Sequence, residues 1–373
     1  MNRLQRYKNR HSHKKYTLTF VKKEKRMEFN TLKVKQVRRL TEKAVAVSFE
    51  IPKELKKTYA FKAGQYATVE HQHQGEVIRR SYSICAAPSE GELVMGVKEI
   101  YQGKFSVYAN RELSAGDALM VSTPEGRFTF ENNRWRSKNI LCIAAGSGIT
   151  PIMSIAKEAL SNHNSNTVYL LYGNQSEADE MFAEELDQLV AAYPERLKLF
   201  RTYSRTASDK GAFGRIDNAL CLHTLKNAFG QPKLDLAYLC GPEGMIETLK
   251  ESLQKYGMPQ DKILYELFYS EKEEVSSSLE GQVLIDVLID GVTHSISAAA
   301  DKLVLDSLLE NDLDAPYSCQ GGVCSSCICK VKKGAVEMVK NQILTDSEIA
   351  QGLTLACQAK ITEAPLSIDF DDV

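Results

Sequence analysis

Four cysteines near the C-terminus constrain this chain more than any other feature of its sequence. They follow the pattern Cys319-x4-Cys324-x2-Cys327, and Cys357 comes after 29 further residues. This spacing is typical of the four thiolates that hold a [2Fe–2S] cluster, three of which come from one tight loop. Gly321–Gly322 would let that loop close and would direct N–H groups at sulfur. Zinc ribbons favour two Cys-x2-Cys pairs instead, so we predict a [2Fe–2S] cluster rather than structural zinc.

The residues around these cysteines have the pattern of a small α+β domain. Two strand-like segments, 282–289 and 293–297, flank Asp290-Gly291, which is a strong hairpin signal. Leucines at helical spacing follow at 303–309, just ahead of the cysteine loop. We predict a plant-type ferredoxin domain of β-grasp fold over residues 282–373, preceded by a polar, Ser-rich linker over 271–281.

Length and composition place this domain in a larger multidomain protein. A chain of 373 residues exceeds what one hydrophobic core usually serves, and 43% apolar with 25% charged residues is an ordinary globular composition. No apolar run approaches the roughly 18 residues of a membrane span, and the start lacks a signal-peptide pattern. Five of the nine cysteines fall within 319–357 rather than in a disulfide framework. We expect a cytoplasmic protein.

The N-terminal arm is strongly basic. Residues 1–26 carry ten Lys or Arg and one acid, Glu24. Such an arm can bind nucleic acid or anionic lipid. We instead expect residues 1–27 to be a disordered tail, or an upstream extension of a chain that starts at Met27, and we expect neither nucleic acid nor a membrane as a partner.

The middle of the chain carries a glycine loop between a strand and a helix. The buried strand 139–145 leads into Gly146-x-Gly148-x-Thr150-Pro151 and then a helical stretch. Such glycines let N–H groups approach a pyrophosphate at a helix N-terminus, and proline suits the first helical position. The loop alone is also consistent with an ordinary strand-to-helix turn. Further strands near 168–174, 197–203 and 236–240, with helices near 180–192 and 244–256, predict a doubly wound α/β nucleotide-binding domain over 133–270.

The first third, residues 28–132, has short strands with turn signals every 8 to 12 residues, which predicts a small antiparallel β-barrel. Within it, Arg79-Arg80-Ser81-Tyr82-Ser83 places a cation, an aromatic ring and a hydroxyl on one strand. Taken alone, this pattern indicates only a surface strand.

The order of these motifs resembles that of the ferredoxin–NADP reductase family. The resemblance rests on Arg80-x-Tyr82-Ser83, Val97-Lys98, Gly103-Lys104-x-Ser106, Gly146-x-Gly148-x-Thr150-Pro151 and Cys240-Gly241-Pro242-x-Gly244. With its C-terminal ferredoxin domain, the chain from about residue 28 resembles the family of phenylacetyl-CoA epoxidase reductase subunits. The reductases of steroid hydroxylases and of the hybrid-cluster protein are near relatives of that family.

The resemblance implies FAD, NAD(P)H and a [2Fe–2S] cluster as cofactors, and it assigns roles to single residues. It places Arg80 on the flavin pyrophosphate, Tyr82 against the isoalloxazine and Ser83 near flavin N5. A guanidinium pairs with phosphate oxygens and an aromatic ring supports a flat heterocycle, so the residue types suit these roles. It implies further cofactor contacts from Val97, Lys98, Gly103, Lys104 and Ser106 for the flavin, and from Gly146, Gly148, Thr150, Pro151, Gly241 and Pro242 for the nucleotide.

Two more assignments concern the reacting rings. The resemblance places Cys240 beside the nicotinamide carbon that gives up hydride, and it brings the stretch Glu266-Leu-Phe268 toward the flavin. The expected catalytic residues are therefore Ser83, Cys240 and Glu266, with Phe268 as a cofactor contact.

Coenzyme choice depends on the tips of two strands. The tip 172–175 lacks the acid that usually hydrogen-bonds the adenosine ribose of NAD. Ser204-Arg205, after the next strand, matches the family's contact to the 2′-phosphate. We expect NADPH, while Glu177 leaves NADH as the alternative.

The three modules together imply an electron-transfer enzyme. NAD(P)H delivers two electrons and a [2Fe–2S] cluster accepts one, so a flavin must stand between them. We expect an NAD(P)H-dependent oxidoreductase that supplies a separate oxygenase, with phenylacetyl-CoA epoxidase first. Reductases of Rieske oxygenases, steroid hydroxylases, desaturases or the hybrid-cluster protein are the alternatives within this class. The alternative outside it is a ferredoxin-like carrier with a regulatory nucleotide domain.

The charge of the ferredoxin domain suggests how an acceptor is recognised. Residues 282–373 contain 14 Asp or Glu against 6 Lys or Arg. Weak docking steered by complementary fields suits electron transfer. We therefore expect a basic patch on the acceptor protein, facing Asp312 and Asp314.

Overall fold

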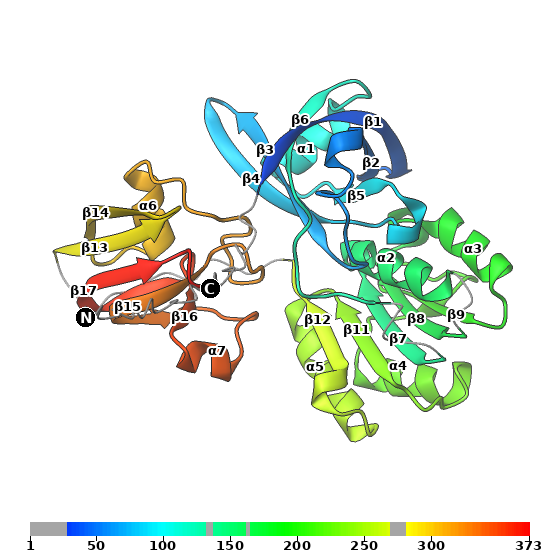
Figure 1. The fold of residues 1–373 in the computed structure, drawn as a ribbon. Coiled ribbons are helices and arrows are strands. Elements are labelled where there is room, and N and C mark those ends of the chain that lie inside the picture. The colour runs from blue at the N-terminus through cyan, green and yellow to red at the C-terminus, as the bar shows by residue number, and fades with distance from the viewer. Residues whose placement is uncertain (1–27, 132–136, 162–164, 269–280) are drawn as a thin grey trace, which may run out of the picture.

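The computed structural model describes residues 28–131, 137–161, 165–268 and 281–373, which form three sheets in three domains (Figure 1). The expected tail over 1–27 and nearly all of the expected linker over 271–281 lie outside these residues. The described domains have the predicted architectures, namely an antiparallel barrel, a parallel α/β sheet and a small α+β domain.

The first domain is a six-stranded antiparallel barrel with the strand order β4-β3-β6-β1-β2-β5. A bridge between Ile84, just after β4, and Met95 in β5 joins the two edges of the sheet. Its elements are β1 (Phe29–Thr41), β2 (Ala44–Glu50), β3 (Tyr66–His73), β4 (Glu76–Ser83), β5 (Leu93–Lys98), α1 (Lys104–Arg111) and β6 (Ala118–Ser122).

The second domain has a parallel sheet with the order β10-β9-β8-β7-β11-β12. Because strand order reverses beside β7, the carboxyl ends of β7 and β11 border the crevice in which such sheets bind ligands. Its elements are β7 (Asn139–Ala145), α2 (Ile149–Leu160), β8 (Thr167–Asn174), α3 (Ala183–Ala192), β9 (Leu197–Tyr203), β10 (Ala212–Phe213), α4 (Asn218–His223), β11 (Leu236–Cys240), α5 (Glu243–Lys255) and β12 (Ile263–Glu266).

The third domain is a five-stranded mixed sheet with the order β14-β13-β17-β15-β16. Asp290 and Gly291, both with positive φ, make the predicted two-residue hairpin turn between β13 and β14. Its elements are β13 (Gln282–Ile289), β14 (Val292–Ala299), α6 (Val304–Glu310), β15 (Ile328–Met338), α7 (Asp346–Ala350), β16 (Leu353–Leu355) and β17 (Ala359–Asp369).

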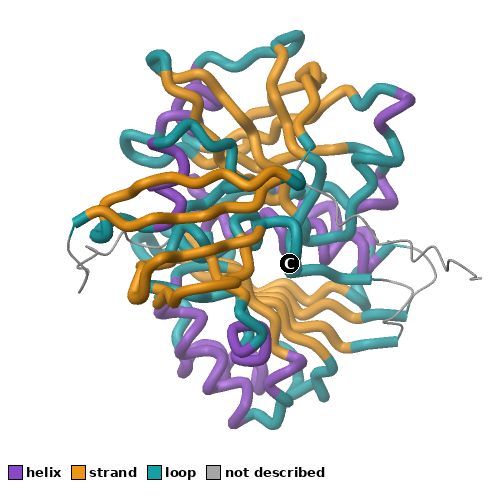
Figure 2. The backbone as a smooth tube through the Cα atoms, turned by 60° about the vertical axis from the view of Figure 1, so that its left-hand side comes forward, coloured by secondary structure: helices purple, strands orange, loops and turns teal. Residues whose placement is uncertain are grey.

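The barrel and the nucleotide domain share one hydrophobic core. Strand β2 is apolar at nearly every position because both of its faces are covered. Ala44 and Ala46 pack with α2 and the nucleotide sheet, whereas Val45 and Val47 fill the barrel. The core of the third domain contains only that domain's own residues. In Figure 2 the strands of the parallel sheet run side by side below the barrel, and the third domain lies in front of both.

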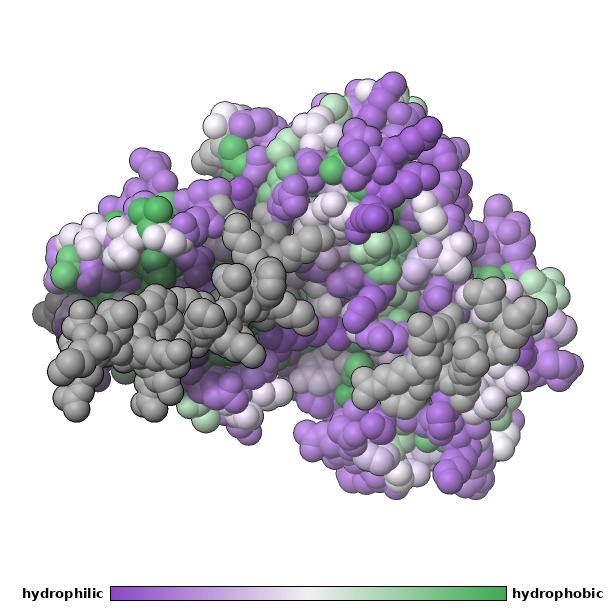
Figure 3. All heavy atoms as spheres, in the orientation of Figure 1, coloured by the Kyte–Doolittle hydropathy of each residue, from purple (hydrophilic) through white to green (hydrophobic). Residues whose placement is uncertain are grey.

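The visible surface is largely hydrophilic, with hydrophobic side chains scattered rather than gathered in one patch (Figure 3). None of the helices in the described ranges is long and apolar enough to cross a membrane.

Candidate functional site

The four motif cysteines come together in the third domain. Three lie on the loop between α6 and β15, and Cys357 lies between β16 and β17. The Cys319 thiol contacts those of Cys324 and Cys357, and the Cys327 thiol contacts that of Cys357. Among the described residues no group of three His, Cys, Asp or Glu side chains has the geometry of a single-ion site. A two-iron cluster needs only two thiolates on each iron.

The loop around these thiols is shaped to enclose a cluster. Gly321 donates its N–H to the Cys319 sulfur at 3.4 Å. Gly322 has φ +72°, and a Cβ there would lie 2.8 Å from the Lys340 carbonyl oxygen. A side chain at position 322 would therefore be strained and would collide with backbone. The four thiols, three of them buried, and this closed loop fit a [2Fe–2S] cluster.

Strand β4 carries the residues that we expected to bind the flavin. The Tyr82 ring lies 5.5 Å from the ring of Phe105 in α1, so the strand and the start of this helix are neighbours. Arg80 is exposed, and its guanidinium donates to the carbonyl of Arg79 at 2.7 Å. The Tyr82 ring and the exposed Arg80 guanidinium therefore both belong to β4, the strand next to α1.

The start of α1 is a tight turn. Gly103 precedes the helix, and a Cβ at this position would lie 2.2 Å from the Ser106 hydroxyl. That hydroxyl accepts the N–H of Ile100 at 3.2 Å. Lys104 is the first residue of α1, whose N-terminus presents the remaining N–H groups.

Strand β5 supplies two further expected contacts, which differ in kind. The Val97 side chain is buried in the barrel core, and its carbonyl accepts from Asn110 at 3.3 Å, so only its backbone remains for a cofactor. The Lys98 ammonium lies 3.8 Å from the position a Cβ would take on Gly146, so it borders the glycine loop of the next domain.

The three expected catalytic residues converge from three strand ends. The Ser83 hydroxyl lies 3.4 Å from the Glu266 carboxylate, and Cys240 is the register partner of Glu266 in the β11–β12 pair. Burial raises the pKa of Glu266 to about 8, which favours the protonated carboxyl group at neutral pH. Burial, and then the charge of Glu266, raise the pKa of the Cys240 thiol well above its usual value. Phe268 lies two residues beyond Glu266 and is 40% exposed.

The glycine loop packs directly on the end of β11. Gly146–Gly148 form a 3₁₀ turn, and a Cβ on Gly148 would lie 2.1 Å from the Cys240 carbonyl oxygen. Gly241 is similarly close to Ala145, where a Cβ would lie 3.1 Å from the alanine Cβ. Pro242 then precedes α5.

The first turn of α2 differs in one detail from our expectation. The helix begins at Ile149, so Pro151 is its third residue and not its first. The predicted helical position of Pro151 was wrong because the 3₁₀ turn ends at Gly148 and the helix starts directly after it, two residues before the proline. Proline is still tolerated, since the first four N–H groups of a helix have no partner within it. Thr150 donates its hydroxyl to the Ser147 carbonyl at 3.0 Å.

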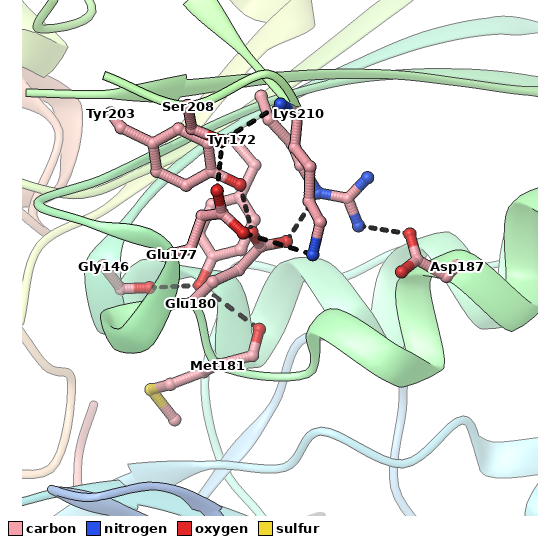
Figure 4. A network of polar contacts seen from close by, with 10 residues as sticks. Gly146, Tyr172, Glu177, Glu180, Met181, Asp187, Tyr203, Ser208 and Lys210 are labelled. Atoms are coloured by element: carbon pink, nitrogen blue, oxygen red, sulfur yellow. Dashed lines mark hydrogen bonds and ion pairs between the residues drawn. The ribbon is translucent and has the colours of Figure 1, made fainter. Parts of the chain in front are cut away.

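A polar network that sequence reasoning missed contacts this loop (Figure 4). The Tyr172 hydroxyl lies 3.3 Å from the carbonyls of Gly146 and Met181. Nearby, the buried Glu180 accepts from the Tyr203 hydroxyl at 2.6 Å and from Arg201 at 2.7 Å. Tyrosines at the ends of two buried strands were the only available signal.

The two strand ends that we expected to determine coenzyme specificity are hydrogen-bonded to each other. Ser204 and Arg205 donate backbone N–H groups to the carbonyls of Asn174 and Gln175, each at 2.9 Å. The Arg205 side chain is exposed. Glu177, the alternative ribose ligand, accepts from Ser208 and pairs with Lys210 at 3.2 Å (Figure 4).

Comparison with known proteins identifies the three domains. Three family models match: an oxidoreductase FAD-binding domain over 31–130, an oxidoreductase NAD-binding domain over 142–251 and a 2Fe-2S iron-sulfur cluster binding domain over 287–362. The chain is 36% identical to one of the subunits of 1,2-phenylacetyl-CoA epoxidase from Escherichia coli, over 92% of this chain and 98% of that protein. The chain belongs to the family of three-domain ferredoxin reductases.

Other relatives of this reductase share its domain order. It is 30% identical to the ferredoxin reductase component of 3-ketosteroid-9-alpha-monooxygenase from Rhodococcus rhodochrous, over 87% of this chain and 92% of that protein. The solved structure of phthalate dioxygenase reductase matches with a TM-score of 0.60 at 22% identity, over 92% of this chain and 98% of that chain. An intact self-sufficient cytochrome P450 monooxygenase matches with a TM-score of 0.66 at 23% identity, over 91% of this chain and 41% of that chain.

The reductase is therefore an NAD(P)H-dependent oxidoreductase that uses FAD and a [2Fe–2S] cluster. The sequence prediction of family, fold class and cofactors is confirmed. The roles of the individual residues are proposals and are taken up below.

Proposed function

We propose that this reductase passes electrons from NADPH through FAD and its cluster to a separate oxygenase, and that Ser83, Cys240 and Glu266 line the place where nicotinamide and flavin meet. The observation that carries this assignment is the convergence of these three side chains from β4, β11 and β12, with Ser83 within 3.4 Å of Glu266. This pair joins the flavin barrel to the end of the nucleotide sheet, and it includes a carboxyl group whose pKa is raised to about 8 by burial.

FAD and the cluster, when bound, convert a two-electron donor into a source of single electrons. The chain supplies the surroundings. Arg80 and the N-terminus of α1, with Gly103, Lys104 and Ser106, would hold the flavin pyrophosphate. Tyr82 would support the ring.

The nucleotide would be held by the crevice at the ends of β7 and β11. The 146–148 turn, Thr150 and Pro151 present the start of α2 to a pyrophosphate, and Gly241-Pro242 leave room for it at the start of α5. The buried Ser83 and Cys240 would keep water away from the reacting rings, and the raised pKa of Glu266 favours an uncharged carboxyl group beside them.

NADPH is the proposed coenzyme. The exposed Arg205 has a guanidinium suited to a 2′-phosphate, and Glu177 already pairs with Lys210, which makes it a poorer partner for a ribose hydroxyl. The proposed domains are 28–132, 133–270 and 282–373. The cytoplasm is the proposed compartment, because none of the nine cysteines, all within described residues, is in a disulfide bond.

Phenylacetyl-CoA epoxidase is the proposed acceptor, because the relative that is alike over 98% of its length is one of the subunits of that enzyme. The steroid monooxygenase is the second candidate, supported by the 30% identity to its reductase component. The test is reconstitution of the holoenzyme with the oxygenase subunits of each system and NADPH. We expect the rate of product formation with the epoxidase subunits to be at least tenfold higher than with the steroid monooxygenase subunits. The reverse preference would overturn the proposed acceptor.

A further inference from the structure

One face of the β3–β4 hairpin meets the ferredoxin domain. Side chains alternate along paired strands, so residues opposite one another share a face. The register pairs Tyr66 with Ser83, Thr68 with Ser81, and Glu70 with Arg79. We call the following residues the docking face: Tyr66, Thr68, Glu70, Arg79 and Ser81. Ser83, the last residue of β4, shares this side of the hairpin and meets Glu266. The residues between them on β4, Arg80 and Tyr82, point to the opposite side, where we place the flavin pyrophosphate and the face of the flavin ring.

The docking face contacts the loop that carries the cluster cysteines. Thr68 donates its hydroxyl to that of Ser318 at 3.2 Å, and Ser81 also hydrogen-bonds Ser318. The Tyr66 hydroxyl lies 3.1 Å from that of Ser326. Ser318 precedes Cys319, and Ser326 precedes Cys327. Each contact thus acts next to a cluster ligand.

Arg79 is the charged centre of this contact. Its guanidinium lies over two aromatic rings, 4.9 Å from the centre of the Phe29 ring and 5.1 Å from that of Tyr317. It pairs with Glu70 at 2.9 Å inside the barrel and with Asp314 at 3.2 Å in the ferredoxin domain. Its side chain is only 13% exposed. Asp314, which we expected to face an external acceptor, makes this pair while its side chain stays 72% exposed.

The rest of the contact is mostly polar as well. Arg127 of the barrel pairs with Glu348 at 2.7 Å, and Glu243 of the nucleotide domain pairs with Lys340 at 2.7 Å. Val323 adds one buried apolar side chain against the nucleotide domain. Ion pairs at a surface are weak and sensitive to salt, so this contact can open, unlike the shared core of the other two domains.

We propose that the docking face is the internal platform that seats the cluster loop behind the flavin strand, with Arg79 as its positioning residue. The inference rests on the proposed function, because it adds a position for the cluster to the proposed electron route. The Arg79 side chain contacts Glu70, Asp314 and the two rings, none of which we assign to a cofactor. It acts by holding the loop through Tyr317 and Asp314.

The test compares Arg79→Ala, Asp314→Asn and Arg79→Lys holoenzymes with wild type. Arg111→Ala is the matched control, since this arginine of the same barrel pairs with Glu99 and lies outside the docking face. Small-angle X-ray scattering from about 0.02 to 0.5 M salt measures separation of the domains. Stopped-flow absorbance and rapid-freeze EPR measure flavin and cluster reduction by NADPH separately.

We expect Arg79→Ala to lower the ratio of docked to separated molecules about tenfold, from the loss of one ring-stacked cation and its ion pair. Separation should then begin at lower salt and cluster reduction should slow, while flavin reduction stays unchanged. Arg79→Lys keeps the charge but not the flat stacked group, so its docked fraction and its rate of cluster reduction should lie between those of wild type and Arg79→Ala. The double variant Arg79→Ala with Asp314→Asn should separate no more readily, and reduce its cluster no more slowly, than Arg79→Ala alone.

The outcomes separate this inference from the proposed function. Scattering and cluster reduction that match wild type and Arg111→Ala at every salt concentration would overturn the docking role while leaving the proposed function intact. Failure of NADPH to reduce the flavin in wild type would overturn the proposed function itself. If Arg79→Ala loses flavin because the pair with Glu70 is gone, Asp314→Asn decides, since it leaves that pair in place.

Discussion

The contact between the glycine loop and β11 is tight enough for one methyl group to disrupt it. In Gly148→Ala the new Cβ would lie 2.1 Å from the Cys240 carbonyl oxygen and 2.5 Å from the carbonyl carbon, where ordinary contacts begin near 3.4 Å. The start of α2 must therefore move about 1.3 Å from β11. Both sides of this contact are backbone, so no side-chain rotation relieves it.

The expected cost follows from this displacement. Overpacking of this kind costs about 1–3 kcal/mol, which lowers the Tm of a domain this size by about 5 °C. N–H groups displaced by more than 1 Å also lose charge-assisted hydrogen bonds to a pyrophosphate, worth about 1.5–3 kcal/mol each. We expect KM for NADPH to rise by about ten- to a hundredfold.

Gly244→Ala is the matched control. Gly244 lies in the first turn of α5 at the same end of the sheet, and a Cβ there would meet nothing within 4 Å. This change should leave KM unchanged and raise stability by up to about 1 kcal/mol. Calorimetry of the holoenzymes and steady-state ferricyanide reduction measure both effects. If Gly148→Ala and Gly244→Ala have the same KM and the same Tm, the contact between Gly148 and Cys240 does not determine the shape of the nucleotide crevice.

Three further predictions concern the other sites. Cys357→Ser should abolish cluster assembly, seen as loss of the EPR signal, yet keep NADPH:ferricyanide activity, and loss of both would contradict separate domains. Burial raises the pKa of Glu266 to about 8, so the protonated form is favoured in the folded state. The protonated carboxyl group contributes its full stabilisation at pH values below the ordinary pKa of a carboxyl group, and this contribution is lost as the pH rises toward and through 8. The Tm of wild type should therefore fall more steeply between about pH 5 and 9 than that of Glu266→Gln, and parallel profiles would refute the assignment. Arg205→Ala should lower kcat/KM for NADPH by about tenfold and leave that for NADH unchanged, so a wild-type preference for NADH that the substitution does not alter would end the NADPH proposal.

The parts of the molecule that were predictable depend on local spacing. The cysteine motif fixes its ligands because three of them lie within nine residues, and the Asp290-Gly291 hairpin needs only its own two turn residues. The meeting of Ser83 with Glu266 joins positions 183 apart, and the family resemblance, not the pattern, pointed to it.

Contacts between distant segments carried no sequence signal. Arg79 and Asp314 lie 235 positions apart, so an exposed strand arginine and a surface acid were all that the sequence offered. Tyr172 supports the Gly146 carbonyl from the end of a buried strand, where an aromatic residue ordinarily indicates only packing. Such roles depend on how whole domains meet, which periodicity and spacing do not encode.

The separate core of the third domain has a consequence for how genes of this kind can recombine. A breakpoint near residue 281 divides no hydrophobic core except at Val323, and it uncovers mainly polar and charged groups with the rings around Arg79. A breakpoint between the barrel and the parallel sheet instead divides a core to which both contribute, including Ala44, Phe130 and Ile152. The ferredoxin domain is therefore an exchangeable cassette that can be moved to another position or another chain, whereas the flavin and nucleotide domains must be inherited together.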